Sequence, residues 1–349
     1  ATPFNIQWIG SRPTFIDVSS FTRYEPGDPW AGYRQFCQQF LYPLFLQAHK
    51  NIPFHPWLRG SLEGITPETC RSMLSGRDYL RPGVLTHVYL QAKAQARYES
   101  ADLNIRRDLR AAGFSAALIK NNVSRLRQTI EHLHWKPIRS TWSEYDRQHP
   151  YDDVDRQGKS NFVSQALARR HWSLVWDLGC NTGTYSRMAA KHAEHVLALD
   201  ADHVVIDRLY RALKEQGDST ILPLVVDIAD PSPGLGWRGR ERQPLSDRGS
   251  PELILCLALV HHLVIGRTIP LAELIAWLAG LGADLIIEFV DRRDPMVNRL
   301  LRNREGQEFE YSTSAIEAAL TQCFSVVTHK TLESGTRTLY YAQAKTHAA

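Results

Sequence analysis

The chain has 349 residues, of which 43% are hydrophobic and 22% are charged, and its formal net charge is +4. These values are typical of a globular protein with a real hydrophobic core, and they exclude a disordered or collagen-like chain. The positive excess is too small and too dispersed to indicate a nucleic-acid-binding protein by itself.

Two further features of the sequence indicate the cellular compartment in which the protein works. The longest clean apolar run, Leu253–Val260, is far shorter than the roughly 20 residues that a membrane-spanning helix needs, so no membrane partner is expected. The five cysteines are odd in number and widely spaced, which predicts buried thiols in a reducing compartment. We therefore expect a cytoplasmic protein.

The N-terminus predicts a β-hairpin within residues 1–20. The strand-like runs Phe4–Ile9 and Thr14–Val18 flank a Gly-Ser-Arg-Pro turn. Asn5 and Asp17 resemble the metal-binding Asn and Asp of kinase-like folds, in which a catalytic Asp lies about five residues before the Asn. That position would precede Ala1, so one interpretation is a remnant of a kinase-like fold in a chain cut from a longer protein. The other is a hairpin with a polar cap.

Helical patterns dominate from Trp30 to Trp135. Tyr33, Phe36 and Phe40 would share one face of a helix, which indicates core, and Pro43 is expected to kink or end that helix. We predict a mainly helical N-terminal region, residues 1–150, that acts as a lid or a cap on the substrate side. A second domain, residues 151–349, follows it.

The first motif of the second domain is a glycine-containing turn. An apolar run ends on Asp177, passes through Gly179, Asn181 and Gly183, and enters a helical pattern near Tyr185. A strand, a glycine turn and a helix N-terminus form a βα unit that binds a nucleotide. Glycines there can take positive φ and let a ligand lie on the backbone. Their Gly-x-x-x-Gly spacing differs from the Gly-x-Gly-x-x-Gly of dinucleotide enzymes.

Two more predicted parallel strands end on an acid. The apolar run after His195 ends on Asp200, and the run Leu222–Val226 ends on Asp227. A carboxylate at the tip of the second strand can accept hydrogen bonds from both ribose hydroxyls. We expect the three acids to converge on one ligand.

With these residues the sequence resembles the class I S-adenosylmethionine-dependent methyltransferases, whose motif I takes the form Asp-Leu-Gly-Cys-Asn-x-Gly found here at residues 177–183. The resemblance implies an α/β fold with a Rossmann-like, mostly parallel sheet, closed by an antiparallel hairpin of Phe324–Thr328 and Thr338–Ala342. It implies S-adenosylmethionine as cofactor. The residues implied to bind it are Asp177, Gly179, Cys180, Asn181 and Gly183 at the methionine end, Asp200 and Ala201 at the ribose, Asp227 and Ile228 at the adenine, and Leu257.

The fourth strand, Leu253–Ala258, runs into His261 and His262, where the acceptor would meet the methyl group. A histidine near its solution pKa can take a proton from a hydroxyl or carbon acid. Adjacent residues of a helix point in different directions, so at most one of the two is expected to face the cofactor. The alternative is that one caps the helix or holds a carbonyl.

Other sites are less defined. Glu288, at the end of the fifth strand, either lines the substrate cleft or pairs with Arg292 or Arg293. The sequence has neither the Asn-Pro-Pro-Tyr motif of amino-group methylases nor the Pro-Cys of cytosine-C5 enzymes. No His/Cys spacing matches a zinc site, so no metal is expected.

The N-terminal half, with its Tyr-Arg-Gln-Phe-Cys and Leu-Arg-Gly-x-Leu-x-Gly-Ile stretches, is similar to a poorly characterised bacterial group of nodulation-protein-like methyltransferases. Together the resemblances imply methyl transfer to an oxygen or carbon of a small-molecule acceptor, and nucleic acid is not the expected partner. Three alternatives stay open: a protein or RNA methyltransferase, a non-catalytic, cofactor-binding regulatory module, and an NAD-dependent oxidoreductase. The sequence indicates neither the acceptor nor the oligomeric state.

Overall fold

The computed structural model describes residues 2–93, 115–136, 153–302, 304 and 310–345. The chain divides into two compact units, one of Ala1–Gln7 with Pro13–Ile138 and one of Trp8–Arg12 with Arg139–Ala349. Each unit is described by itself. The predicted boundary between residues 150 and 151 lies outside the described residues, and it stays a prediction, as does the role of the first region as a lid.

The chain begins with the predicted hairpin, made of β1 (Ile6–Ile9) and β2 (Arg12–Phe15). Asn5 Nδ2 donates to Asp17 Oδ2 across 2.9 Å, so the two residues that resemble a metal-binding pair bond to each other. Short helical turns flank the hairpin at η1 (Pro3–Asn5) and η2 (Val18–Ser20). The hairpin prediction is confirmed.

The rest of the first unit is helical in its described part. Its elements are α1 (Tyr33–Phe36), the π-helical turn η3 (Cys37–Leu41), α2 (Tyr42–Lys50), α3 (His55–Gly60), α4 (Pro67–Met73), η4 (Gly76–Leu80), the π-helical turn η5 (Leu85–Leu90) and α7 (Ala116–Glu131). Tyr33 and Phe36 pack against the buried cluster around Cys37 and Phe45, as the aromatic pattern predicts. The helix continues past Pro43 to Lys50, with the irregular turn η3 directly before it, so it does not end there.

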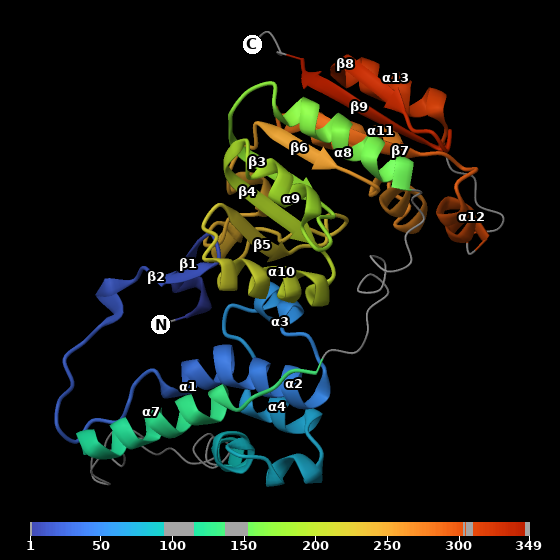
Figure 1. Ribbon diagram of the computed structural model, residues 1–349. Helices are drawn as coiled ribbons and strands as arrows, with labels where there is room; N and C mark the ends of the chain where they lie inside the picture. The colour runs from blue at the N-terminus through green and yellow to red at the C-terminus, as the bar shows by residue number, and fades with distance from the viewer. Residues whose placement is uncertain (1, 94–114, 137–152, 303, 305–309, 346–349) are drawn as a thin grey trace. The chain divides into compact units, whose positions relative to one another are not determined.

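The second unit is built on a seven-stranded sheet in the order β5-β4-β3-β6-β7-β9-β8 (Figure 1). The strands are β3 (Trp172–Leu178), β4 (Ala193–Asp200), β5 (Ile221–Val225), β6 (Leu253–Cys256), β7 (Asp284–Val290), β8 (Phe324–Thr331) and β9 (Arg337–Ala344). The first five are parallel, whereas β9 pairs antiparallel with both β7 and β8. This mostly parallel sheet closed by an antiparallel hairpin confirms the predicted fold class.

Helices cover both faces of the sheet (Figure 1). One core cluster joins the sheet to α8 (Asp153–Leu167), α9 (Thr184–Ala189) and α10 (His203–Gln216), and the other joins it to η9 (His262–Gly266), α11 (Leu271–Gly280) and α13 (Thr313–Cys323). A further helix, α12 (Pro295–Arg302), follows β7. Val175 belongs to the first cluster and Trp176 to the second, because successive strand residues point to opposite faces. Asp177 therefore faces α8 and α9.

The strand ends position the site. In the register, Leu178 of β3 lies beside Leu199 of β4 and Cys256 of β6, so the segments that follow these strands emerge at one edge of the sheet. Over the described residues, no helix combines the length and the apolar character that crossing a membrane requires.

Candidate functional site

The turn after β3 is shaped by three residues with positive φ, Gly179 (74°), Asn181 (48°) and Gly183 (82°). The backbone N–H groups of Gly179 and Cys180 donate to Leu199 O at 2.8 and 3.0 Å, which fixes the turn against β4. The expected strand–turn–helix unit is therefore present.

Gly183 is not among the residues that line the cavity described below, so its contact with the cofactor stays a prediction. It is the N-cap of α9, and a Cβ added there would come within 2.7 Å of Leu209 Cδ1. Close packing of the turn against α10 therefore requires glycine at this position. From the sequence alone, a glycine that close helix packing requires cannot be distinguished from a glycine that ligand contact requires.

A cavity of about 300 Å³ opens at the carboxyl edge of the sheet. Ten of the twelve predicted site residues line it: Asp177, Gly179, Cys180, Asn181, Asp200, Ala201, Asp227, Ile228, Leu257 and His262. Gly183 and His261 are the other two. The volume is at the lower end of the range for small-molecule sites.

The three predicted carboxylates have different environments. Asp177 is 2% exposed, accepts a 2.6 Å hydrogen bond from Ser186 Oγ, and burial raises its pKa to about 6. Asp200 accepts the backbone N–H groups of Asn181 and Asp202, each at 2.9 Å, and burial raises its pKa as well. These contacts orient the Asp200 carboxylate at the tip of β4.

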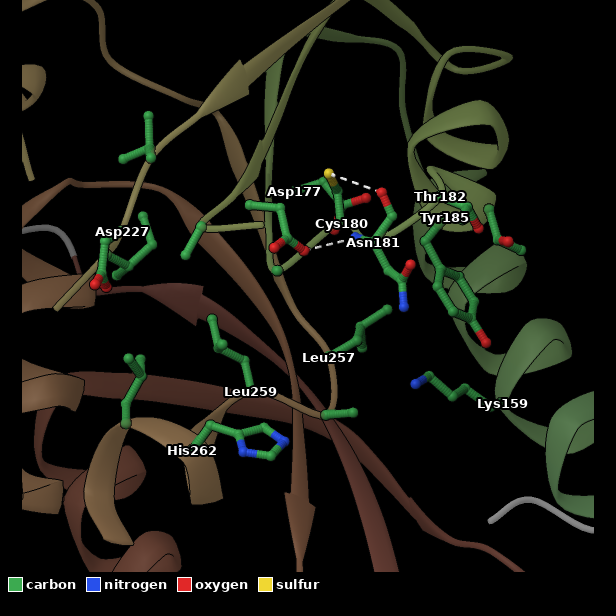
Figure 2. Close-up of a pocket in the computed structure, with 18 of the residues that line it drawn as sticks. Lys159, Asp177, Cys180, Asn181, Thr182, Tyr185, Asp227, Leu257, Leu259 and His262 are labelled. Atoms are coloured by element: carbon green, nitrogen blue, oxygen red, sulfur yellow. Dashed lines mark hydrogen bonds between the residues drawn. The ribbon is translucent and has the colours of Figure 1, made fainter. Parts of the chain in front are cut away.

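The third carboxylate, Asp227, lies at the opposite end of the cavity from Lys159 (Figure 2). Its Oδ1 accepts the backbone N–H of Ala229 at 3.0 Å, and its Oδ2 contacts Arg267 Nη2. Asp227 is thus engaged with a cation that sequence analysis did not single out.

Asn181 contributes a polar group that is not satisfied within the protein. Its side-chain Oδ1 is buried and has no hydrogen-bond partner among the described residues. Figure 2 shows its carboxamide on the cavity wall, between Cys180 and Lys159. A buried acceptor without a donor costs free energy, so this oxygen is suited to a donor on a ligand.

Lys159, which lines the cavity, belongs to a buried ionic network. Lys159 Nζ lies 2.6 Å from Glu288 Oε2, and Arg337 Nη1 lies 3.2 Å from Glu288 Oε1. Arg337 Nη2 also lies 2.9 Å from Asp294 Oδ2, and none of the four side chains is more than 5% exposed. The network ties α8 to the ends of β7 and β9. Lys159 also lies 4.9 Å from the ring centre of Tyr185, so its ammonium is held in place.

The predicted pairing of Glu288 with Arg292 or Arg293 is wrong. Arg292 Nε donates to Tyr311 O at 2.7 Å, and Arg293 Nε pairs with Asp291 at 2.8 Å. The true partners of Glu288 come from a helix and a strand far away in the chain, which short-range sequence reasoning could not find.

The two histidines are separated by their environments. His261 is fully buried, and neither of its ring nitrogens has a hydrogen-bond partner among the described residues. The ring of His262, 4.0 Å away between centroids, lines the cavity and points into it (Figure 2). Burial, and secondarily the charge of Arg337, lowers the pKa of His262 to about 4. At neutral pH this imidazole is uncharged and can accept a hydrogen bond.

Several lining residues were not predicted as site residues. Arg156, Lys159, Thr182, Thr184, Tyr185, Val226, Ala258, Leu259, Leu263 and Arg267 complete the wall. Most are sequence neighbours of predicted residues, which is the signal that could have found them. Arg267 has no predicted site residue beside it in the sequence. Within the described ranges, no group of three or more His, Cys, Asp or Glu side chains could hold a metal ion.

The arrangement suits a ligand with several hydroxyl or amino donors. Three carboxylates and an amide oxygen line a cavity whose walls are otherwise largely apolar, and such a site binds polar donors at fixed positions. A neutral imidazole and a buried ammonium lie on the wall away from Asp227 (Figure 2). Proton acceptance and charge stabilisation are both possible there.

Comparison with known proteins finds a relative that matches over most of the chain. The chain is 36% identical over 342 residues to the nodulation protein NoeA of Rhizobium meliloti (strain 1021), a match that covers 97% of this chain and 72% of that protein. No family model matches the sequence.

The solved structures to which the chain is similar share little sequence identity with it. The N-methyltransferase NodS from Bradyrhizobium japonicum WM9 is 14% identical, with a TM-score of 0.41, over 56% of this chain and 99% of its own. WbdD is 20% identical, with a TM-score of 0.40, over 57% of this chain and 42% of its own. Both TM-scores are low.

Proposed function

Since the chain belongs to the family of the nodulation protein NoeA, we propose for it the activity that its own site supports best, methyl transfer from S-adenosylmethionine to a small-molecule acceptor. The observation that carries the proposal is the convergence of Asp177, Asp200 and Asp227 on one cavity beside a glycine turn. They lie at or just after the carboxyl ends of three consecutive parallel strands, and chance seldom places acids at all three ends on one edge.

The residues present fit the cofactor chemically. Asp200 offers lone pairs to the ribose hydroxyls, and Asp227 offers them to the exocyclic amino group of adenine. The unpartnered Oδ1 of Asn181 and the buried carboxylate of Asp177 suit the cationic amino-acid end. When bound, S-adenosylmethionine supplies a methyl group on a sulfonium, which is electrophilic without metal assistance.

The protein's part in the transfer is chiefly alignment. A rigid cleft that holds two reactants in line lowers the barrier by making the step effectively unimolecular. His262 is the proposed proton acceptor, because its neutral ring faces the cavity, whereas His261 does not line it. With a pKa of about 4 it is a weak base, so we propose that it accepts a hydrogen bond from the acceptor and receives the proton as the methyl group moves.

A small molecule is the proposed acceptor because the site is a cavity of about 300 Å³ that opens at the edge of the sheet, rather than a broad charged surface. An oxygen or carbon atom is the proposed nucleophile, since both need a nearby proton acceptor. The cytoplasm remains our expectation for where the protein works.

The test is a transfer assay with tritiated S-adenosylmethionine and bacterial extract divided into small-molecule, protein and RNA fractions. We expect label in the small-molecule fraction, and at least tenfold less with His262→Gln. His195→Gln is the matched control, because His195 is exposed on β4 and does not line the cavity. Label in protein or RNA would support a macromolecular methyltransferase instead. Binding without transfer to any fraction would support a regulatory module.

A further inference from the structure

An ion pair crosses the cavity at its adenine end. Arg267 Nη2 contacts Asp227 Oδ2, and both residues line the cavity. Asp227 follows β5, whereas Arg267 follows η9, which comes after β6. The pair therefore links two segments of the cavity wall that lie 40 residues apart in the chain.

The backbone that carries Arg267 is held by hydrogen bonds, while its side chain is largely exposed. Arg267 N donates to Leu263 O at 3.2 Å, and Gly266 O accepts a 2.8 Å hydrogen bond from Arg304 Nη2. The Arg267 side chain is nevertheless 57% exposed. A guanidinium on a long, exposed side chain can leave one partner without moving the loop.

The two oxygens of Asp227 have separate partners. Oδ1 is turned towards the backbone N–H of Ala229, as part of the turn that follows β5. Oδ2 is the oxygen that remains for a ligand, and this is the oxygen that Arg267 holds. A donor on a ligand and the guanidinium therefore seek the same acceptor.

We infer that Arg267 is a positioning residue that competes with the cofactor for Asp227. Before the cofactor binds, the guanidinium holds Oδ2; on binding, the exocyclic amino group of adenine replaces it and Arg267 turns to solvent. This inference rests on the proposed function, because it requires adenine at Asp227. It predicts that the ion pair weakens cofactor affinity.

The test is isothermal titration with S-adenosylhomocysteine, which carries the adenine but no sulfonium charge. An exposed ion pair is worth little, so Arg267→Gln is expected to bind about two- to fivefold more tightly than the wild type. The gain should shrink at high salt, since salt screens the pair in the wild type. In an Asp227→Asn background, Arg267→Gln should give no gain.

Arg211→Gln is the matched control. Arg211 pairs with Asp207 on α10 at 2.9 Å, is similarly exposed, and does not line the cavity, so its loss should leave affinity unchanged. Weaker or unchanged binding by Arg267→Gln, with wild-type binding intact, would overturn the inference alone. No binding by the wild type would instead overturn the proposed function.

Discussion

Replacement of Asp177 by Asn is expected to stabilise the sheet-containing unit at neutral pH and to weaken cofactor binding. Asp177 is 2% exposed, and burial, only partly offset by the hydrogen bond from Ser186, raises its pKa from the usual 3.8 to about 6. An ionised carboxylate there costs free energy that a neutral amide of similar size does not. The amide oxygen can still accept the hydroxyl hydrogen of Ser186.

The magnitude follows from the pKa difference. A shift of about 2 pKa units corresponds to about 3 kcal/mol, because each unit is worth about 1.36 kcal/mol. A raised pKa means that the folded state binds the proton more tightly than the unfolded state. The favourable contribution is therefore complete below about pH 4 and is lost as the pH rises through 6. Asp177→Asn should accordingly gain almost nothing near pH 4 and up to about 3 kcal/mol at pH 8.

Urea unfolding followed by tryptophan fluorescence checks this, since Trp172 and Trp176 are buried beside Asp177 in β3. Midpoints and slopes of wild type and variant are compared at pH 4.5, 6 and 7.5, so that all other titrating groups cancel. Asp207→Asn, at a half-buried position of α10 outside the cavity, is the control and should show no such pH-dependent gain. A variant less stable than wild type at pH 7.5, or a gain independent of pH, would refute the reasoning.

Three other variants test the site and its supports. Gly183→Ala should lose about 2 kcal/mol of stability, because the φ of residue 183 is +82° and the added Cβ would meet Leu209. Gly217→Ala is the control: φ is also positive there, but the space around it is open, so the loss should be about 1 kcal/mol. Thermal unfolding compares the two variants. Glu288→Gln removes the carboxylate that the buried Lys159 and Arg337 share and should cost about 3–5 kcal/mol in urea unfolding. Because burial lowers the pKa of His262 to about 4, the turnover rate at saturating cofactor should not rise between pH 6 and 8; a sigmoidal rise centred near pH 6.5 would contradict this assignment.

The fold could be predicted because its signals are local. Three of the five parallel strands are short apolar runs with an acid at or near the carboxyl end, namely Asp177, Asp200 and Asp227. Parallel strands in an α/β sheet bring their carboxyl ends to one edge, so the order of the acids in the sequence already implies a shared site. Ten of the twelve predicted residues line one cavity for this reason.

The positions of Gly183 and His261 outside the cavity lining depend on packing between elements. Gly183 faces Leu209, which comes from the next helix along the chain, and His261 turns into the core while its neighbour turns into the cavity. A pattern of two adjacent histidines at the start of a π-helical turn does not fix which one turns inward. The partner of Glu288 on α8 and the position of Arg267 opposite Asp227 are long-range pairings that no local spacing encodes.

The most direct test of the shared site is the affinity of S-adenosylhomocysteine for wild type and Asp200→Asn, measured by isothermal titration with Asp207→Asn as the control. Asp200 is oriented by two backbone N–H groups and lines the cavity, whereas Asp207 lies outside it. We predict micromolar or tighter binding by the wild type and the control, and at least tenfold weaker binding by Asp200→Asn, since an interaction with a charged group is worth about 1.5–3 kcal/mol. Equal affinity of all three proteins, or no binding by the wild type, would contradict a shared cofactor site.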